Sequence, residues 1–269
     1  MKNNCHLAFY ILPLTVIVLA GCVSRNEKLL KACMGARFDE ARLLLKEGAN
    51  PAYRGKHGVT PLVLSVRNDN ISMVKQLIDA GADPNDCRNG YDPLCEAASS
   101  RNPEMWHLLI AAGAHVNASN SAGWTPLKSA ISAQNVEFTE LLISKGADVN
   151  ASSSLYYALG NGTLTKILIK AGAKVNVADA QGRTPLHYVS CPQSASLLIE
   201  AGANINAISS GQDTPLDAAR ARLREWKTYD DEVHGVYRSK KDVERSVANQ
   251  EEIIAILESH GARSYIELK

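Results

Sequence analysis

The sequence lacks any strong excess of charge and any cluster of chemistry-bearing side chains. Its 29 basic and 28 acidic residues give a net charge of +1, whereas binding to nucleic-acid phosphates needs a basic face. Nucleic acid is therefore not expected as a partner. The seven histidines are scattered, and no serine, cysteine or carboxylate group accompanies them at the spacing of a nucleophile or metal site. No catalytic residue, metal ligand or cofactor is expected.

Cysteine is also sparse, and its spacing fits neither a disulfide framework nor paired zinc ligands. Cys33 falls at a helical position where a small apolar residue is usual, which predicts a buried thiol. Cys87 and Cys95 flank one turn and can either pair or remain free. The glycines fall at turns and helix ends, so no phosphate-binding loop is expected.

Long apolar runs are absent except for one near the start of the chain. The run from Leu7 to Ala20 follows the positive Lys2 and is too short to cross a bilayer and then stop. It closes on Leu19-Ala20-Gly21-Cys22. This ending resembles the lipobox of bacterial lipoproteins, which implies cleavage before Cys22 and lipidation of Cys22. The alternative is an ordinary signal peptide with an incidental cysteine.

The resemblance implies a lipoprotein signal peptide over residues 1–21 and a short lipid tether over 22–26. Two or three acyl chains hold a protein stably, because each buried methylene contributes about 0.8 kcal/mol. Val23 is not the aspartate that retains many lipoproteins in the inner membrane, so the periplasmic side of the outer membrane is favoured. A tether this short spans at most about 14 Å, which predicts a folded part close to the membrane.

A Gly that follows an apolar block recurs through the rest of the chain. It stands at Gly48, Gly81, Gly113, Gly146, Gly172, Gly202 and Gly261. Between these glycines a Thr/Asp-Pro-Leu motif begins at Thr60, Asp92, Thr125, Thr184 and Thr214. Thr or Asp before Pro predicts a capped helix start, and the Gly predicts a left-handed helix end. Two helices per repeat follow from this pattern.

The pattern resembles the ankyrin repeat. The resemblance implies an all-α ankyrin-repeat solenoid, built from helix-turn-helix units with β-hairpins and containing about seven repeats including caps. It covers residues 27–263 and leaves 264–269 as a C-terminal tail. In such arrays each repeat packs on its neighbours.

Three repeats near the C-terminus depart from the family pattern. The fifth lacks Thr-Pro-Leu, and its Gly160-Asn161-Gly162 predicts a broken helix. The sixth is contracted between its helices. The last carries an insertion at about 222–249, which predicts an appended helical arm. This arm either contacts a partner or the membrane, or is a solvated hairpin without a role.

Aromatic and arginine side chains mark the face through which ankyrin arrays usually bind proteins. The candidate partner-binding residues are Tyr91, Trp124, Tyr156, Tyr157, Arg183 and Tyr188. These residue types dominate interface energies. The alternative is that the rings pack on neighbouring loops and only stabilise them. His187 follows Thr184-Pro185-Leu186, where the family carries a structural histidine that ties adjacent loops.

The expected function is therefore non-catalytic binding of one protein partner by a monomeric lipid-anchored module. The most specific form of this expectation rests on fold-level analogy. The chain resembles ankyrin-type immunity lipoproteins paired with secreted phospholipase effectors of type VI systems, which predicts neutralisation of a membrane-attacking toxin. An envelope scaffold, or a protective partner of a resident periplasmic enzyme, is the alternative. An enzyme that uses the irregular repeats is the least favoured reading.

Overall fold

The computed structural model describes residues 25–86, 91–120, 122–228 and 239–269. Cys22 with the lipobox, and Cys87, lie outside these ranges. All regular elements within them are helices, as expected for an all-α solenoid. The chain divides into two compact units, residues 1–129 and 130–269, and the boundary falls inside the helix α7 (Pro126–Ser132).

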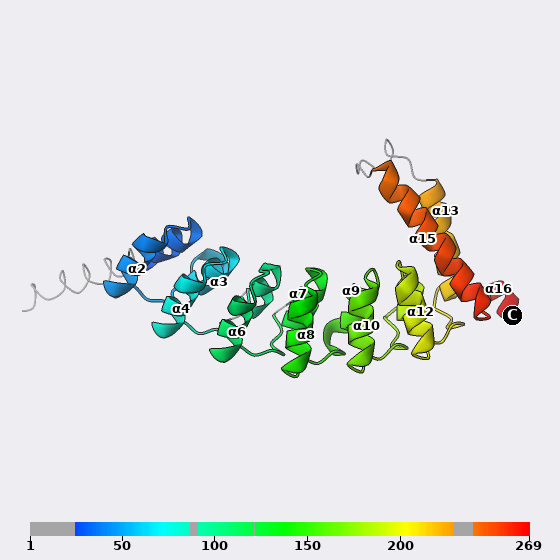
Figure 1. Ribbon diagram of the computed structural model, residues 1–269, viewed down its shortest axis with the longest axis horizontal. Helices are drawn as coiled ribbons and strands as arrows, with labels where there is room; N and C mark the ends of the chain where they lie inside the picture. Colours follow the sequence, from blue (N-terminus) through cyan, green and yellow to red (C-terminus); the bar gives the residue numbers. More distant parts are fainter. Residues whose placement is uncertain (1–24, 87–90, 121, 229–238) are drawn as a thin grey trace, which may run out of the picture. The chain divides into compact units, whose positions relative to one another are not determined.

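The first unit is a succession of short helix pairs (Figure 1). Its first helix covers residues 25–34 and so begins two residues earlier than the sequence boundary at 27. The following elements are α2 (Phe38–Lys46), η1 (Lys56–Gly58), α3 (Pro61–Arg67), α4 (Ile71–Asp79), α5 (Pro93–Glu96), η3 (Ala97–Ser99) and α6 (Pro103–Ala111).

The second unit continues the same pattern with less regular members. Its elements are α8 (Val136–Ser144), η4 (Ala151–Ser153), α9 (Ser154–Ala158), α10 (Gly162–Lys170), α11 (Pro185–Tyr188), α12 (Pro192–Glu200), α13 (Pro215–Lys227), α15 (Lys240–Ser259) and α16 (Tyr265–Leu268).

Side-chain caps define where the helices begin. The Thr60 hydroxyl accepts from the backbone N–H of Val63 at the start of α3, and Asp92 does the same for Cys95 in α5. Asparagine caps the second helix of four repeats: Asn70, Asn102, Asn135 and Asn161 precede α4, α6, α8 and α10. Such caps contribute about 1 kcal/mol each, so the repeat motif sets the helix boundaries locally.

Asparagines in the loops also join consecutive repeats. In the second unit, Asn176 donates to the carbonyl oxygen of Gly202 at 2.9 Å and accepts from the N–H of Asn204 at 2.7 Å. Asn85 makes the same pair of bonds in the first unit, to Gly113 and His115. The left-handed glycines therefore present carbonyl oxygens that the preceding repeat satisfies.

Two sequence expectations need correction. The loops between repeats contain no strands in the described ranges; tight turns occur there instead, as where the N–H of Asp179 donates to the carbonyl oxygen of Arg183 at 2.9 Å. The Gly160-Asn161-Gly162 segment does not break a helix. It is the turn between α9 and α10, and the Asn161 side chain caps α10 through the N–H groups of Thr163 and Leu164.

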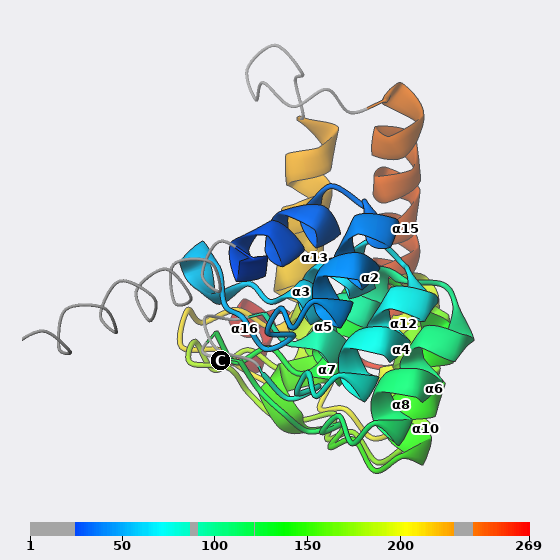
Figure 2. The same cartoon turned by 90° about the vertical axis from the view of Figure 1, so that its left-hand side faces the viewer.

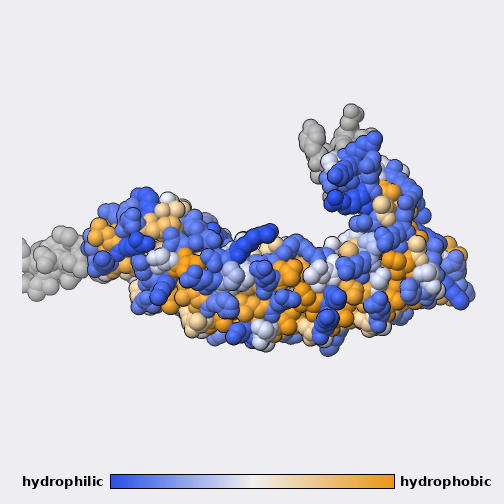
Figure 3. Space-filling view, in the orientation of Figure 1, coloured by the Kyte–Doolittle hydropathy of each residue, from blue (hydrophilic) through white to orange (hydrophobic). Residues whose placement is uncertain are grey.

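The insertion in the last repeat lengthens both of its helices. The first, α13, has 13 residues and the second, α15, has 20, against 7 and 9 in α3 and α4. The two pack side by side in both views (Figures 1 and 2). Hydrophilic residues dominate the ends of α13 and α15 that lead into residues 229–238 (Figure 3). The predicted arm is thus a paired helical extension.

The C-terminal residues 264–269 contact the start of α13. Ser264 caps α16 in a capping box with Glu267. The backbone N–H of Tyr265 donates to the Asp217 carboxylate at 2.7 Å, which joins α16 to the start of α13.

Candidate functional site

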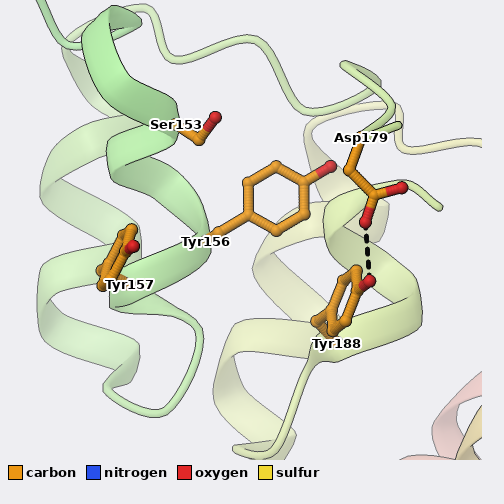
Figure 4. Close-up of a pocket in the computed structure, with 5 residues that line it drawn as sticks. All are labelled: Ser153, Tyr156, Tyr157, Asp179 and Tyr188. Atoms are coloured by element: carbon orange, nitrogen blue, oxygen red, sulfur yellow. Dashed lines mark hydrogen bonds between the residues drawn. The ribbon is translucent and has the colours of Figure 1, made fainter. Parts of the chain in front are cut away.

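Three of the predicted tyrosines line one cavity in the second unit. Its volume is about 400 Å³, and Ser153, Tyr156, Tyr157, Asp179 and Tyr188 line it (Figure 4). We call it the tyrosine pocket. The ring centroids of Tyr156 and Tyr188 lie 5.6 Å apart in an edge-on arrangement. A cavity of this size with an aromatic lining is typical of ligand and side-chain binding sites.

Consecutive repeats supply the two exposed rings of the tyrosine pocket. Tyr157 is the third residue after Ser154 in α9, and Tyr188 is the third after Pro185 in α11. The side chains keep 43% and 37% of their surface exposed. Because neighbouring repeats stack in register, the same helical position in each places the rings on one side of the unit.

Tyr156 plays a structural part in the same pocket. Its hydroxyl lies 2.7 Å from the carbonyl oxygen of Val177 and 2.8 Å from that of Arg183, both in the next loop. Burial is the first cause that raises the pKa of Tyr156 to about 12, followed by the Asp179 charge. Tyr156 therefore stays protonated and acts as a donor that holds the pocket wall.

Asp179 supplies the charge of the pocket. One carboxylate oxygen accepts from the N–H groups of Gln181 and Arg183, each at 2.9 Å, and the other accepts the Tyr188 hydroxyl at 2.6 Å. Partial desolvation opposes ionisation, but these hydrogen bonds outweigh it and lower the pKa of Asp179. The carboxylate is therefore ionised at neutral pH.

Arg183 lies beside the tyrosine pocket without lining it. Its guanidinium donates to Asp213 at 3.0 Å, and its Cζ lies 5.9 Å from the centroid of the Tyr188 ring. The nearby Tyr188 side chain is the largest cause that raises the pKa of Arg183, and the Asp213 carboxylate raises it further. Arg183 thus fixes one side of the Tyr188 ring and joins two loops.

The remaining candidates, Tyr91 and Trp124, belong to the first unit, where cations cover their rings. Arg67 lies 4.6 Å from the Tyr91 centroid, and Glu96 binds that guanidinium through bonds of 2.7 and 2.9 Å. Lys128 lies 4.5 Å from the Trp124 centroid. Both aromatic residues are partly buried. These contacts match the alternative in which the rings brace neighbouring residues, and they still leave part of each side chain accessible.

Sequence reasoning found the three tyrosines and Arg183 but missed Asp179 and Ser153. A detectable signal existed for Asp179, since it stands four residues before Arg183, where side chains that accept from turn N–H groups are favoured. Ser153 carries no such signal, because its place at the pocket follows from its left-handed backbone before α9.

His187 has the structural role expected of it. It is 1% exposed, its Nδ1 accepts from the N–H of Thr184 at 3.1 Å, and its Nε2 lies 3.2 Å from the carbonyl oxygen of Asp213 in the next loop. Burial is the main cause that lowers the pKa of His187. The neutral imidazole therefore links two repeats.

Cys33 and Cys95 carry no reactive signature. Cys33 is buried, as expected, and burial raises its pKa to about 11. Burial likewise raises the pKa of Cys95, whose Sγ lies 4.0 Å from the carbonyl oxygen of Trp124. The described part of the chain contains no cluster of three or more His, Cys, Asp or Glu side chains fit to hold a metal ion. None of its helices has the length and apolarity needed to span a membrane.

Comparison with known families gives two matches. The family model described as "Ankyrin repeats (3 copies)" matches residues 14–87 and 82–153, and the model "Ankyrin repeat" matches residues 181–210. The matches cover more than half of the chain and both units.

Curated proteins with similar sequence share only part of their length with this chain. An ankyrin repeat protein of fowlpox virus is 34% identical over 89 residues, which is 33% of this chain and 20% of the viral protein. The human ankyrin repeat and KH domain-containing protein 1 is 34% identical over 103 residues, 37% of this chain and 4% of that protein. Human protein fem-1 homolog A is 39% identical over 85 residues, which is 26% of this chain and 13% of that protein. The chain therefore spans a fifth or less of these relatives.

Among solved structures, the ankyrin repeat domain of Bcl-3, described as a member of the IkappaB protein family, is similar with a TM-score of 0.60 and 24% identity. The match covers 83% of this chain and 97% of that domain. At this identity the likeness concerns the fold alone.

Proposed function

Because this chain belongs to the ankyrin repeat family, a family of protein-interaction modules, we propose that it is a non-catalytic module that binds one protein partner through the tyrosine pocket. The observation that carries the proposal is the pair of exposed rings, Tyr157 and Tyr188, which consecutive repeats present at an open cavity. Exposed tyrosines are among the side chains that contribute most to protein interfaces.

The surroundings of the pocket also suit a protein partner. Val177, whose carbonyl oxygen lies at the Tyr156 hydroxyl, exposes 47% of its side chain, and Ile208 in the next loop exposes 51%. Apolar residues around an aromatic centre exclude water from a contact and so strengthen it. Tyr91 and Trp124 of the first unit are a second candidate contact in the same proposal.

Substitution of the two rings tests the contact. With the full chain as bait and its partner quantified, Tyr157→Leu together with Tyr188→Leu should weaken binding by about 2 kcal/mol or more, as removal of central interface aromatics does. Met34→Ala in the first unit is the control, since Met34 is apolar and 60% exposed. Trp124→Ala tests the second candidate contact. If neither change weakens binding, the interface lies elsewhere.

The proposal extends to location. The lipobox at Cys22 supports lipid anchoring at the periplasmic side of the cell envelope, with Val23 favouring the outer membrane. Metabolic labelling with a fatty acid and fractionation of membranes test this directly. Cys22→Ser should abolish both the label and the membrane association, and a labelled or membrane-bound variant would contradict the anchor.

The most specific form of the proposal is that of an immunity protein. A binder held near the lipid surface is suitably placed to block a secreted phospholipase that attacks that membrane, as a type VI effector does. Cells that carry the chain should survive such an effector, and Cys22→Ser should lose protection while binding in solution persists. If the captured partner is a resident periplasmic enzyme or a set of envelope proteins, the immunity role is wrong and the alternative, a protective or scaffolding role, replaces it.

A further inference from the structure

The carboxylate of Asp179 is not required for the turn that it caps. Three loops use a side chain five residues before the capping threonine of the next helix to accept two backbone N–H groups. Asn120 binds Ala122 and Trp124, each at 3.0 Å, and Ser209 binds Gly211 and Asp213 at 3.1 and 3.4 Å. Asp179 does the same for its own loop. A neutral side chain therefore suffices for the turn, and the negative charge at position 179 is available for another purpose.

That charge is not cancelled by its neighbours. Arg183 approaches from the same loop but forms an ion pair with Asp213 at 3.0 Å. Arg183 and the nearby Arg222 both act on the Asp213 charge, whereas Asp179 is the carboxylate that lines the tyrosine pocket. The Tyr188 hydroxyl, which donates to Asp179 at 2.6 Å, holds the carboxylate against the aromatic lining.

The aromatic lining suits a cation. A guanidinium or ammonium group is attracted to a ring face within about 6 Å of its centroid. Rings of this chain already make such contacts, since Arg183 lies 5.9 Å from the Tyr188 centroid and Arg67 lies 4.6 Å from that of Tyr91. In the pocket, the rings of Tyr157 and Tyr188 line a volume of about 400 Å³. This volume is within the range of about 300–1,000 Å³ that is usual for ligand pockets.

From this geometry we propose that the tyrosine pocket receives a basic side chain, arginine or lysine, of the protein partner, with its charged end at the Asp179 carboxylate and its stem against Tyr157 and Tyr188. The inference rests on the proposed protein-binding function and specifies the chemistry of the contact. The aromatic rings bury the apolar stem of the side chain, and the carboxylate balances the charge that this burial desolvates.

A pair of peptides that differ only in charge tests the inference. The probes are acetyl-Leu-Arg-Leu-amide and the same peptide with citrulline, which keeps the shape of arginine but is neutral. The full chain, carrying ¹³C in its tyrosine rings, is titrated with each peptide by NMR. We expect the arginine peptide to shift the Tyr157 and Tyr188 signals with at least fivefold higher affinity than the citrulline peptide. The signal of Tyr53, in the first unit and outside both candidate contacts, is the internal reference.

Asp179→Asn is the decisive variant because asparagine at position 120 shows that an amide sustains the same turn. It should remove most of the preference for the arginine peptide while leaving the thermal transition of the chain unchanged. Equal affinity for the two peptides, an unchanged preference in Asp179→Asn, or an absence of shifts at Tyr157 and Tyr188 would each overturn the inference.

Partner binding separates this inference from the proposed function. If Tyr188→Leu weakens capture of the partner but Asp179→Asn does not, the pocket binds the partner without a basic side chain, and only the inference fails. If the peptides bind with the expected preference but the double tyrosine variant captures the partner normally, the proposed contact fails, and the partner is excluded as the source of the basic side chain.

Discussion

Tyr156 and His187 make the same contact in successive repeats. The Tyr156 hydroxyl lies 2.8 Å from the carbonyl oxygen of Arg183, and His187 Nε2 lies 3.2 Å from that of Asp213. Each acceptor directly precedes the capping threonine of the next repeat, Thr184 or Thr214. The tyrosine thus replaces the imidazole as the link between repeats, although the two neutral side chains differ in length and in the donor group that they offer.

Loss of the Tyr156 hydroxyl should therefore cost stability rather than binding. Tyr156→Phe keeps the ring but leaves the carbonyl oxygens of Val177 and Arg183 without this donor, so we expect a loss of about 1 kcal/mol in the free energy of unfolding. Urea unfolding followed by circular dichroism measures it. Tyr188→Phe is the control. The Tyr188 hydroxyl is at the exposed edge of the pocket, where water replaces it, so this variant should lose less free energy of unfolding than Tyr156→Phe.

The buried His187 should make stability depend on pH. Burial lowers its pKa below the ordinary value of 6.5, so the unfolded chain binds this proton more readily than the folded chain. The contribution is fully present above about pH 6.5 and is lost as pH falls through the lower folded-state pKa. Urea unfolding of the wild type and of His187→Gln across this range should show that the stability advantage of the wild type shrinks in acid. A constant difference would contradict the assignment.

Gly162 and Gly160 should respond oppositely to alanine. A Cβ on Gly162 overlaps the side chain of Gln193, whose own Cβ lies 2.8 Å away, whereas at Gly160 the nearest heavy atom is Ser190 Oγ at 3.4 Å. Gly162→Ala should lose about 1 kcal/mol, and Gly160→Ala should gain about 0.5 kcal/mol because the unfolded chain loses freedom. The unfolding midpoints of the two variants, compared with that of the wild type, test both expectations. Adding Gln193→Ala to Gly162→Ala should recover part of the loss if the clash is the cause, because it removes the side-chain atoms beyond Cβ but keeps the Cβ at 2.8 Å.

Arg222 should be the most sensitive residue of the insertion. Its guanidinium donates to the carbonyl oxygens of His187 and Val189 at 2.5 and 3.1 Å and to Gln250 at 3.2 Å. Arg222→Met keeps the apolar stem but removes these charged donors, which should cost about 2–3 kcal/mol in urea unfolding. Arg224→Met, at an exposed position of the same helix, should change stability by less than about 0.5 kcal/mol.

Features that depend on interactions between residues close together in the sequence could be predicted best. The helix caps and the left-handed glycines depend on residues within one repeat motif, so they were predictable. The role of His187, whose acceptor lies in the next repeat, followed from the family resemblance. The Gly160-Asn161 turn was misread because two glycines resemble a broken helix, whereas Asn161 is a helix cap. Arg222 was missed because two of its acceptors lie in the preceding repeat, and a charged residue in a mixed-charge segment reads as solvated. Asp179 was missed although its hydrogen bonds stay within its own repeat, because the pocket that it lines also needs Tyr156 and Tyr157 of the preceding repeat.

The contraction of the sixth repeat and the insertion in the seventh depend on each other. The first helix of the sixth repeat, α11, has only four residues, and the carbonyl oxygens at its end are those that Arg222 binds. Asn249, at the other end of the insertion, lies 3.5 Å from the carbonyl oxygen of Ser190 in the same segment. Deleting residues 222–249 to restore a regular seventh repeat would therefore expose the unpaired end of the sixth. A regular array therefore requires both repeats to be rebuilt together.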